Sequence, residues 1–277
     1  MFIKRKSSMG IQSDVQFIKG SSTLGGVSLS VYAYCVDGVL IDTGSVSLQS
    51  EFAEFFHKVP FNQVLLTHHH EDHTGGAAYI QQHFDVALYM HEQFIESCKK
   101  RARYPFYRRV FWGRRPPFSA QALSFKEPII SKTSRWRAIE TPGHSSDHVA
   151  FLNEQTGQLF SGDLYVHPET KLILRSENIH EVIASIERLL TYDIGEMFCS
   201  HAGYIDDGPK ALRRKHSYLT SLRDEILYLH EEKGYSEKEI HQMLFRRKYP
   251  IMYFSLGEWH TKYIVRSVLS SQQKNVY

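Results

Sequence analysis

The run from Thr67 to Gly76 reads THHHEDHTGG and concentrates the residue types that bind metal ions. It directly follows the apolar stretch 64–66, which is typical of a short buried strand. In extended backbone, alternate side chains share a face and can reach the same ion. A surface loop that binds metal only adventitiously is the alternative explanation for such a run. The candidate ligands for two neighbouring ions are His68, His70, Asp72 and His73.

Three later segments repeat this arrangement of an apolar strand followed by a ligand-type side chain. Strands are predicted around residues 136–139, 158–160 and 197–199, because each stretch is short and apolar. The side chains that follow these strands are His144 after Pro-Gly, Asp163 after Gly, and His201 after Ser. Four strand ends therefore supply ligand types, which makes an adventitious loop a weaker explanation.

The order of these motifs resembles the metallo-β-lactamase superfamily over roughly Val27 to Gly203. That family has a His-x-His-x-Asp-His run, a lone His after Pro-Gly, an Asp after Gly, and a final His. The resemblance implies an α/β fold of the αββα sandwich type, with all ligands on one edge. By the same resemblance, His68, His70 and His144 hold one metal ion, Asp72, His73 and His201 hold a second, and Asp163 bridges them.

The ligand types suit zinc, and they also suit manganese or iron, because imidazole and carboxylate bind all three. Two ions about 3.5–4 Å apart can share a water molecule and present it as hydroxide to a carbonyl or phosphoryl centre. The chain has no Gly-x-Ser-x-Gly elbow that would favour a serine nucleophile. Asp72 is predicted to have a catalytic role, orienting the water or accepting its proton.

Asp42 ends the predicted strand 39–41 in the manner of the family's first motif. The resemblance implies that Asp42 supports the metal ligands without binding an ion. A turn-forming or helix-capping Asp before the amphipathic segment 48–59 is the local alternative.

The remaining elements divide the chain into a catalytic domain, residues 1–207, and a helical appendage, residues 208–277. Asp37-Gly38 predicts a hairpin turn between strands 27–36 and 39–41. The appendage has a capping box at Ser236–Glu239. Helices are predicted over residues 47–59, 75–83, 179–192, 208–233 and 256–269.

Composition sets the outer limits. The chain has 277 residues, 42% hydrophobic content and a formal net charge of +3, which is too small to indicate a general nucleic-acid binder. No signal peptide or membrane-spanning stretch is evident. Three separated cysteines without Cys-x-x-Cys spacing favour a reducing compartment, and we expect a cytoplasmic protein.

The segment 99–118 has the most unusual composition of the chain. It holds eight Lys or Arg residues and six aromatic residues, and no acidic residue occurs between Glu96 and Glu127. One interpretation is a lid that recruits a small anionic substrate through Arg108 and Arg109, or a platform for nucleic acid. The other is an arm whose aromatic residues pack on the domain or on a second subunit, giving a homodimer.

The expected activity is hydrolysis of a small ester, thioester or lactone. The Thr-Gly-Gly ending at residues 74–76 resembles the glyoxalase II branch, although the segment after Asp163 and the final histidine lack that branch's motifs. Tyr165 and Tyr204 are candidate donors to a substrate carbonyl. The alternatives are a phosphodiesterase or ribonuclease of the same superfamily, and a non-hydrolytic di-iron or binding module.

Overall fold

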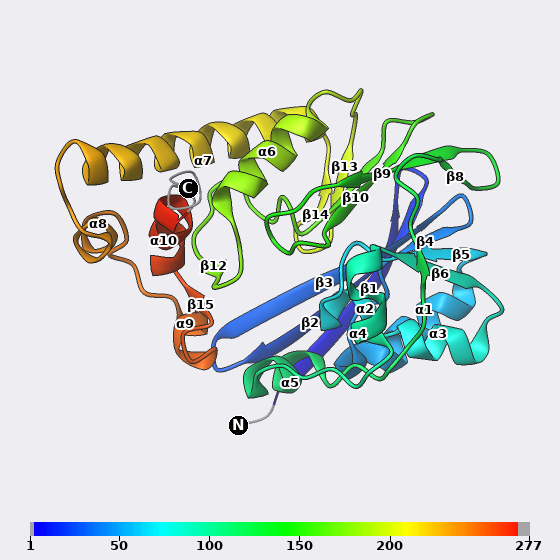
Figure 1. The fold of residues 1–277 in the computed structure, drawn as a ribbon. Coiled ribbons are helices and arrows are strands. Elements are labelled where there is room, and N and C mark those ends of the chain that lie inside the picture. The colour runs from blue at the N-terminus through cyan, green and yellow to red at the C-terminus, as the bar shows by residue number, and fades with distance from the viewer. Residues whose placement is uncertain (1–2, 271–277) are drawn as a thin grey trace.

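The computed structural model describes residues 3–270 and shows two β-sheets packed face to face with helices on both outer sides (Figure 1). This confirms the predicted αββα sandwich. Two short strands far apart in sequence, β12 (Ile173–Leu174) and β15 (Trp259–His260), form a separate antiparallel pair. No described helix is long and apolar enough to cross a membrane.

The first sheet has seven strands in chain order, antiparallel from β1 to β4 and parallel from β4 to β7. The change to parallel pairing occurs where helices connect successive strands. The predicted hairpin at Asp37-Gly38 is confirmed, and Val36 pairs with Val39. The strands are β1 (Lys4–Gln12), β2 (Val15–Leu24), β3 (Val27–Val36), β4 (Val39–Ile41), β5 (Gln63–Leu65), β6 (Ala87–Met90) and β7 (Gln121–Ala122).

The second sheet has six strands in the order β14-β13-β11-β10-β9-β8. Only the β11–β13 pair is parallel. Its strands are β8 (Ile129–Ile130), β9 (Arg135–Glu140), β10 (Val149–Asn153), β11 (Leu159–Gly162), β13 (Met197–Cys199) and β14 (Gly203–Ile205).

The helices form the two outer layers, and short 3₁₀ turns at Val46–Leu48 and Glu92–Phe94 precede two of them. The predicted capping box at Ser236–Glu239 is confirmed at the start of α8. The helices are α1 (Gln49–Lys58), α2 (Glu71–Thr74), α3 (Ala77–His83), α4 (Ile95–Cys98), α5 (Phe106–Trp112), α6 (Ile179–Leu189), α7 (Gly208–Glu231), α8 (Glu237–Leu244), α9 (Pro250–Phe254) and α10 (Lys262–Ser270).

Three hydrophobic clusters correspond to the three interfaces between the four layers. One lies between the first sheet and helices α1, α3 and α5, and includes Phe52 and Phe111. The second lies between the sheets, around Trp136 and Phe160. The third joins the second sheet to α6, α7, α8 and α10. This third cluster contains residues from both sides of residue 207. The division into two domains at that residue stays a prediction.

One expected element needs correction, and two strands were not expected from the sequence. The predicted helix 256–269 is interrupted, because Trp259–His260 pair with β12 and α10 begins only at Lys262. Strands β1 and β2 were not predicted. Strand β1 is exposed along most of its length and pairs with β2 alone, so it lacks the apolar alternation that marks a strand in sequence.

Candidate metal centre

The ends of five strands bring the predicted ligands and the supporting residue Asp42 to one edge of the sandwich. Strand β4 leads to Asp42, and β5 leads to the run that begins at Thr67. Strands β9, β11 and β13 lead to His144, Asp163 and His201. Parallel and antiparallel strands of both sheets thus end at one place, as expected for a site built from loops on a rigid scaffold.

Three histidines of the first predicted metal site converge on one point. The Nδ1 atom of His70 lies 3.0 Å from Nε2 of His68 and 3.1 Å from Nε2 of His144. All three side chains are buried. Nitrogens about 2.0–2.1 Å from a tetrahedral zinc ion lie about 3.3 Å from one another, so this spacing fits a shared ion.

The second group lies beside the first and is joined to it by Asp163. The Oδ2 atom of Asp163 lies 3.0 Å from Nε2 of His201 and 3.3 Å from Nε2 of His144. Its Oδ1 atom lies 3.4 Å from Nε2 of His73. The carboxylate of Asp72 lies 3.8 Å from His73 and 3.7 Å from His201. Asp163 therefore occupies the position between the two groups that a bridging ligand requires.

Two buried polar atoms at this centre, which lie 3.4 Å apart, form no hydrogen bond within the described chain. They are Nε2 of His73 and Oδ1 of Asp163. Buried polar atoms almost always have a partner, and a bound ion can supply one where the chain does not. The donor set of imidazoles and carboxylates suits divalent metal ions, so the residues fit the metals that the fold family implies.

The buried carboxylate of Asp42 connects three segments around the ligand cluster. Its carboxylate receives hydrogen bonds from Thr67 N–H at 2.9 Å and Ser200 Oγ–H at 3.1 Å, and lies 2.7 Å from Nδ1 of His73. Its backbone is left-handed, with φ of 59°, a conformation that Asp adopts more readily than most residues. Asp42 therefore fixes the ring of His73, the arrangement that supports a metal-binding histidine.

His148 plays a similar role for Asp163. Burial and the neighbouring His144 lower the pKa of His148 to about 4, so its ring is neutral at pH 7. Its Nε2 atom can then accept a hydrogen bond from Asp163 N–H at 2.9 Å, and its Nδ1–H donates to Thr141 Oγ at 2.8 Å. His148 thus fixes the backbone of Asp163.

Gly143 allows His144 to approach α6. Its φ is 135°, and a Cβ atom there would lie 2.6 Å from the backbone nitrogen of Val182. Glu177, which precedes α6, places Oε1 3.5 Å from Nδ1 of His144. This contact was not predicted, because nothing in the local pattern relates Glu177 to a histidine 33 positions earlier.

Two further acidic side chains beside the ligand run were also missed. Asp147 accepts a hydrogen bond from His69 N–H at 2.9 Å and lies 2.9 Å from its Nδ1 atom. The ring of His69 stacks on Phe94, with 3.8 Å between centroids, so it points away from the ligands. Glu71 is buried and forms a two-pronged ion pair with Arg108. Acidic residues often stand near histidines in sequence, so the positions of Asp147 and Glu71 alone do not predict these two contacts.

An apolar cavity of about 380 Å³ opens onto one side of the ligand cluster, and His144, Asp163 and His201 form part of its wall. Lys215 of α7 also lines it and is buried, and burial lowers the pKa of Lys215 to about 8. Trp259 from the C-terminal part contributes another side. The apolar lining consists of Leu164, Val166, Leu172, Ile173, Ile179 and Val182.

Neither Tyr165 nor Tyr204 lines the apolar cavity, and their substrate contacts stay a prediction. The Tyr165 ring is buried in the cluster beneath α6, and its carbonyl accepts a hydrogen bond from Lys215. The register of β13 and β14 places Tyr204 opposite Phe198, and its hydroxyl donates to Asp206 at 3.1 Å. The sequence could not reveal this orientation, which depends on strand pairing.

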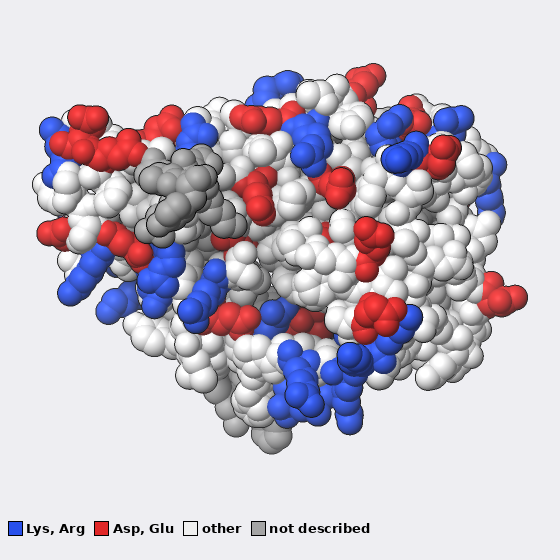
Figure 2. Space-filling view, viewed as in Figure 1, with Lys and Arg blue, Asp and Glu red and all other residues white. Residues whose placement is uncertain are grey.

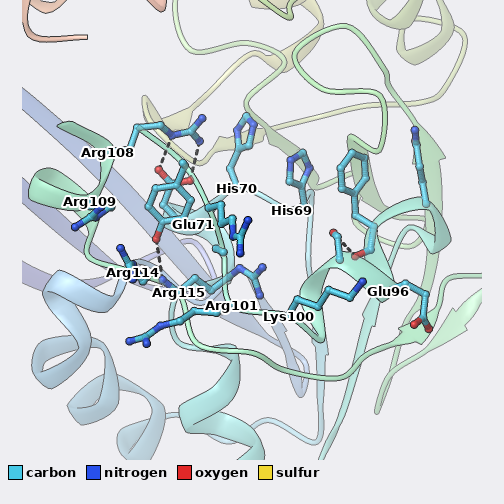
Figure 3. A pocket seen from close by; sticks show the side chains of 16 residues that line it. His69, His70, Glu71, Glu96, Lys100, Arg101, Arg108, Arg109, Arg114 and Arg115 are labelled. Atoms are coloured by element: carbon cyan, nitrogen blue, oxygen red, sulfur yellow. Dashed lines mark hydrogen bonds and ion pairs between the residues drawn. The ribbon is translucent and has the colours of Figure 1, made fainter. Parts of the chain in front are cut away.

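A second cavity, of about 1260 Å³, reaches the other side of the cluster at His69 and His70. Lys and Arg side chains gather over α5 and the segment before it, beside the hollow on that face (Figure 2). The substrate-recruiting role of Arg108 stays a prediction, and the structure shows its guanidinium already paired. Its guanidinium donates to both oxygens of Glu71, at 2.6 and 2.7 Å (Figure 3). It also donates to Glu258 at 3.3 Å. Arg109 is exposed and stacks over Phe106.

The family model for the metallo-beta-lactamase superfamily matches residues 24–230. The chain belongs to the metallo-beta-lactamase superfamily. It is 24% identical to an atrochrysone carboxyl ACP thioesterase of Pseudocercospora fijiensis over 73% of this chain and 58% of that protein. It is 28% identical to a hydroxyacylglutathione hydrolase of a Marinomonas species over 44% of this chain and 40% of that protein.

Solved structures show the same fold. A beta-lactamase domain protein from Burkholderia ambifaria has a TM-score of 0.66 at 20% identity, covering 95% of this chain and 88% of that one. A metallo-beta-lactamase from Pontibacter korlensis has a TM-score of 0.61 at 19% identity, covering 78% and 99%. The chain spans about half the length of the curated relatives that it matches.

Proposed function

We propose that this protein is a binuclear metal-dependent hydrolase that cleaves a small thioester or a related ester or lactone. The observation that carries the proposal is the convergence of two ligand groups on Asp163 beside an apolar cavity. The names of the relatives add support, because they include thioesterases and a hydroxyacylglutathione hydrolase.

The residues divide naturally between two divalent ions, with zinc proposed first and manganese or iron as alternatives. Such ions, when bound, polarise a carbonyl oxygen and lower the pKa of water toward about 7. We assign His68, His70 and His144 to one ion, Asp72, His73 and His201 to the other, and Asp163 to both.

The protein's own groups then position the substrate and handle the proton. Asp72 is the proposed proton acceptor, because its carboxylate lies at the edge of the second ligand group. Glu177 beside Nδ1 of His144 holds that ring in place. Lys215 brings a buried cation to the wall of the apolar cavity and can bind an oxygen of the acyl half.

A carbonyl substrate is favoured over a phosphodiester by the lining of the cavity that contains Asp163. Six aliphatic side chains line it, and the cationic segment 99–118 contributes none of its walls. A phosphodiesterase would need cations around the scissile phosphate to balance its charge. Phosphodiesterase or ribonuclease activity therefore remains the second candidate.

The proposed cellular setting is the cytoplasm. All three cysteines are buried and unpaired, which supports a reducing compartment such as the cytoplasm. A homodimer stays a prediction.

The test is a hydrolysis assay with the zinc-loaded and manganese-loaded protein on a thioester, a lactone and a bis(aryl) phosphodiester. We expect the carbonyl substrates to react orders of magnitude faster. Asp163→Ala is expected to lose both turnover and bound metal, and Asp206→Ala serves as an exposed control. A phosphodiester preference would reverse the substrate assignment, and full activity of Asp163→Ala would remove the bridging role.

A further inference from the structure

The metal centre lies between two cavities of opposite character. His70 lines the larger cavity and His144 lines the smaller one, although their ring nitrogens are only 3.1 Å apart. The smaller cavity has six aliphatic side chains and the buried Lys215 in its wall, and its other charged residues include both signs, Glu169, Lys171 and Glu177. The larger one is bordered by the segment 99–118, which carries most of its charged residues. A substrate that crosses the centre would therefore meet an apolar environment on one side and a cationic one on the other.

Several cations of the larger cavity have no acidic partner among the described residues. Arg108 is occupied by Glu71 and Glu258, and Arg115 donates to backbone carbonyls of residues 98 and 116. The other cationic residues of the wall form no ion pair within residues 3–270 and are exposed. These residues are Lys100, Arg101, Arg103, Arg109 and Arg114.

The ion pairs of Arg108 with Glu71 and Glu258 fix the structure of this cavity wall but do not neutralise the charge of its other cations. Glu71 is fully used by Arg108, so the carboxylate nearest to His70 cannot balance the remaining cations. The hydroxyl of Tyr104 accepts a hydrogen bond from Arg115 N–H at 2.7 Å and donates to the carbonyl of Gly113 at 2.6 Å. Figure 3 shows Arg109, Arg114 and Arg101 to the left of and below Glu71, with His70 and then His69 to its right. The hydrogen bonds and ion pairs thus fix the position of the segment 99–118, while several of its guanidinium groups remain available to bind an anion.

We propose that the larger cavity binds a phosphate group on the thiol-bearing half of the thioester, while the smaller cavity holds the acyl half. Guanidinium forks match phosphate oxygens in two-pronged hydrogen bonds. The larger volume, about 1260 Å³, suits a long phosphate-bearing arm, whereas about 380 Å³ has room for roughly a dozen atoms of the size of a water molecule. This inference rests on the proposed thioester hydrolysis.

The reaction is balanced in this orientation. A water oxygen adds to the acyl carbon, the carbon–sulfur bond breaks, and the sulfur takes a proton to leave as a thiol. The acyl group leaves as a carboxylate, and its remaining proton passes to solvent through the proposed acceptor Asp72. The carboxylate is released from the apolar side and the phosphate-bearing thiol from the cationic side.

The experiment compares two thioesters with the same hexanoyl group, one on coenzyme A and one on uncharged N-acetylcysteamine. The metal-loaded variant Arg101→Gln with Arg114→Gln is expected to raise KM for the coenzyme A thioester about tenfold, with kcat little changed. The effect on the uncharged thioester should stay within about twofold. The control variant Lys233→Gln with Lys238→Gln removes two exposed cations that line neither cavity and should change neither KM.

Added salt gives an independent readout. KM for the coenzyme A thioester should rise with sodium chloride in the unaltered protein and rise less steeply in the Arg101/Arg114 variant, because fewer charges remain to be screened. A carrier protein that bears the same hexanoyl group on its phosphate-linked arm separates the two sources of this chemistry. A lower KM for the carrier protein, lost in the variant, would identify it as the source, and a lower KM for coenzyme A would identify the free thioester.

Failure of this inference is distinguishable from failure of the proposed function. Equal changes in KM for both hexanoyl thioesters, or a preference for a glutathione thioester over the phosphate-bearing ones, would overturn the phosphate assignment while thioester hydrolysis stands. If the variant instead lost binding of single-stranded RNA and kept its KM for coenzyme A thioester, the cavity would be a nucleic-acid site. No hydrolysis of any thioester by the metal-loaded protein would overturn the proposed function itself.

Discussion

The ligand edge and the segment 99–118 both contain many charged or titratable side chains, but they are built in opposite ways. At the ligand edge, the ligand side chains other than the partly exposed His201 are buried. Most of them have a hydrogen-bonding partner from another strand end, as His73 has in Asp42. In the segment 99–118, the aromatic residues Phe111 and Trp112 are buried while most cations face solvent. The first region is fixed for chemistry, whereas the second is anchored by its rings and leaves its charges free to bind.

The largest effect that would test this comparison is expected for Asp42→Ala. The substitution leaves the N–H of Thr67, the hydroxyl of Ser200 and the ring of His73 without their buried acceptor. We expect a loss of about 3 kcal/mol in the free energy of unfolding and a 10- to 100-fold weaker metal affinity. Urea unfolding of the metal-free protein and metal titration measure the two effects separately.

Asp206→Ala is the matched control, because Asp206 is exposed and its side chain accepts a hydrogen bond from Tyr204. Its effect should stay within about 0.5 kcal/mol. If Asp42→Ala reduced the free energy of unfolding equally little and left metal binding unchanged, the ligands would not depend on the hydrogen bonds of Asp42.

The next largest effect is expected for Arg108. This residue belongs to the cationic segment 99–118, but its side chain is poorly exposed and paired, like those at the ligand edge. Its side chain is 14% exposed and that of Glu71 is 3% exposed, so Arg108→Ala strands a carboxylate in a poorly hydrated place. We expect a loss of about 2–3 kcal/mol in the free energy of unfolding. Burial already raises the pKa of Glu71, although Arg108 opposes that shift, and protonation of the stranded Glu71 will soften the loss.

Arg109→Ala is the neighbouring control, and its effect on stability should stay within about 0.5 kcal/mol because the side chain is exposed. Urea midpoints at equal m-values compare the two variants. Similar midpoints for both would mean that Arg108 is not part of the fixed structure, and its interpretation as a substrate contact would regain support.

The same contrast explains which features could be predicted from the sequence. Ligand types directly after apolar strands identified the candidate metal centre, because the end of a strand determines where the next few side chains lie. The Glu71–Arg108 pair joins residues 37 positions apart, and Lys215 reaches the apolar cavity from a helix whose local pattern is ordinary. Such contacts depend on how distant elements pack, which local periodicity does not specify. The direction of the Tyr204 side chain was not predictable for the same reason, since it follows from pairing with Phe198.

The smallest of these effects is expected for Gly75→Ala, which tests whether close backbone packing also fixes the ligand edge. Gly75 N–H donates to the carbonyl of Gly44 at 2.8 Å, and this contact joins the end of α2 to the loop after β4. An added Cβ would lie 2.5 Å from the backbone nitrogen of Val46 and 2.7 Å from the carbonyl oxygen of Gly44. Backbone atoms cannot give way as a flexible side chain can, so we expect a loss of about 2 kcal/mol in the free energy of unfolding.

Gly195→Ala is the matched control. Its φ lies outside the left-handed region, and the nearest atoms to an added Cβ are 3.8 Å away. Calorimetry of the metal-free variants should therefore show a lower Tm for Gly75→Ala and a nearly unchanged Tm for Gly195→Ala. Because Gly75 follows the helix that carries His73, the Gly75 variant should also bind metal more weakly, whereas the control should not. Equal Tm values would mean that the loop after β4 moves freely and that side-chain hydrogen bonds alone hold the ligands in place.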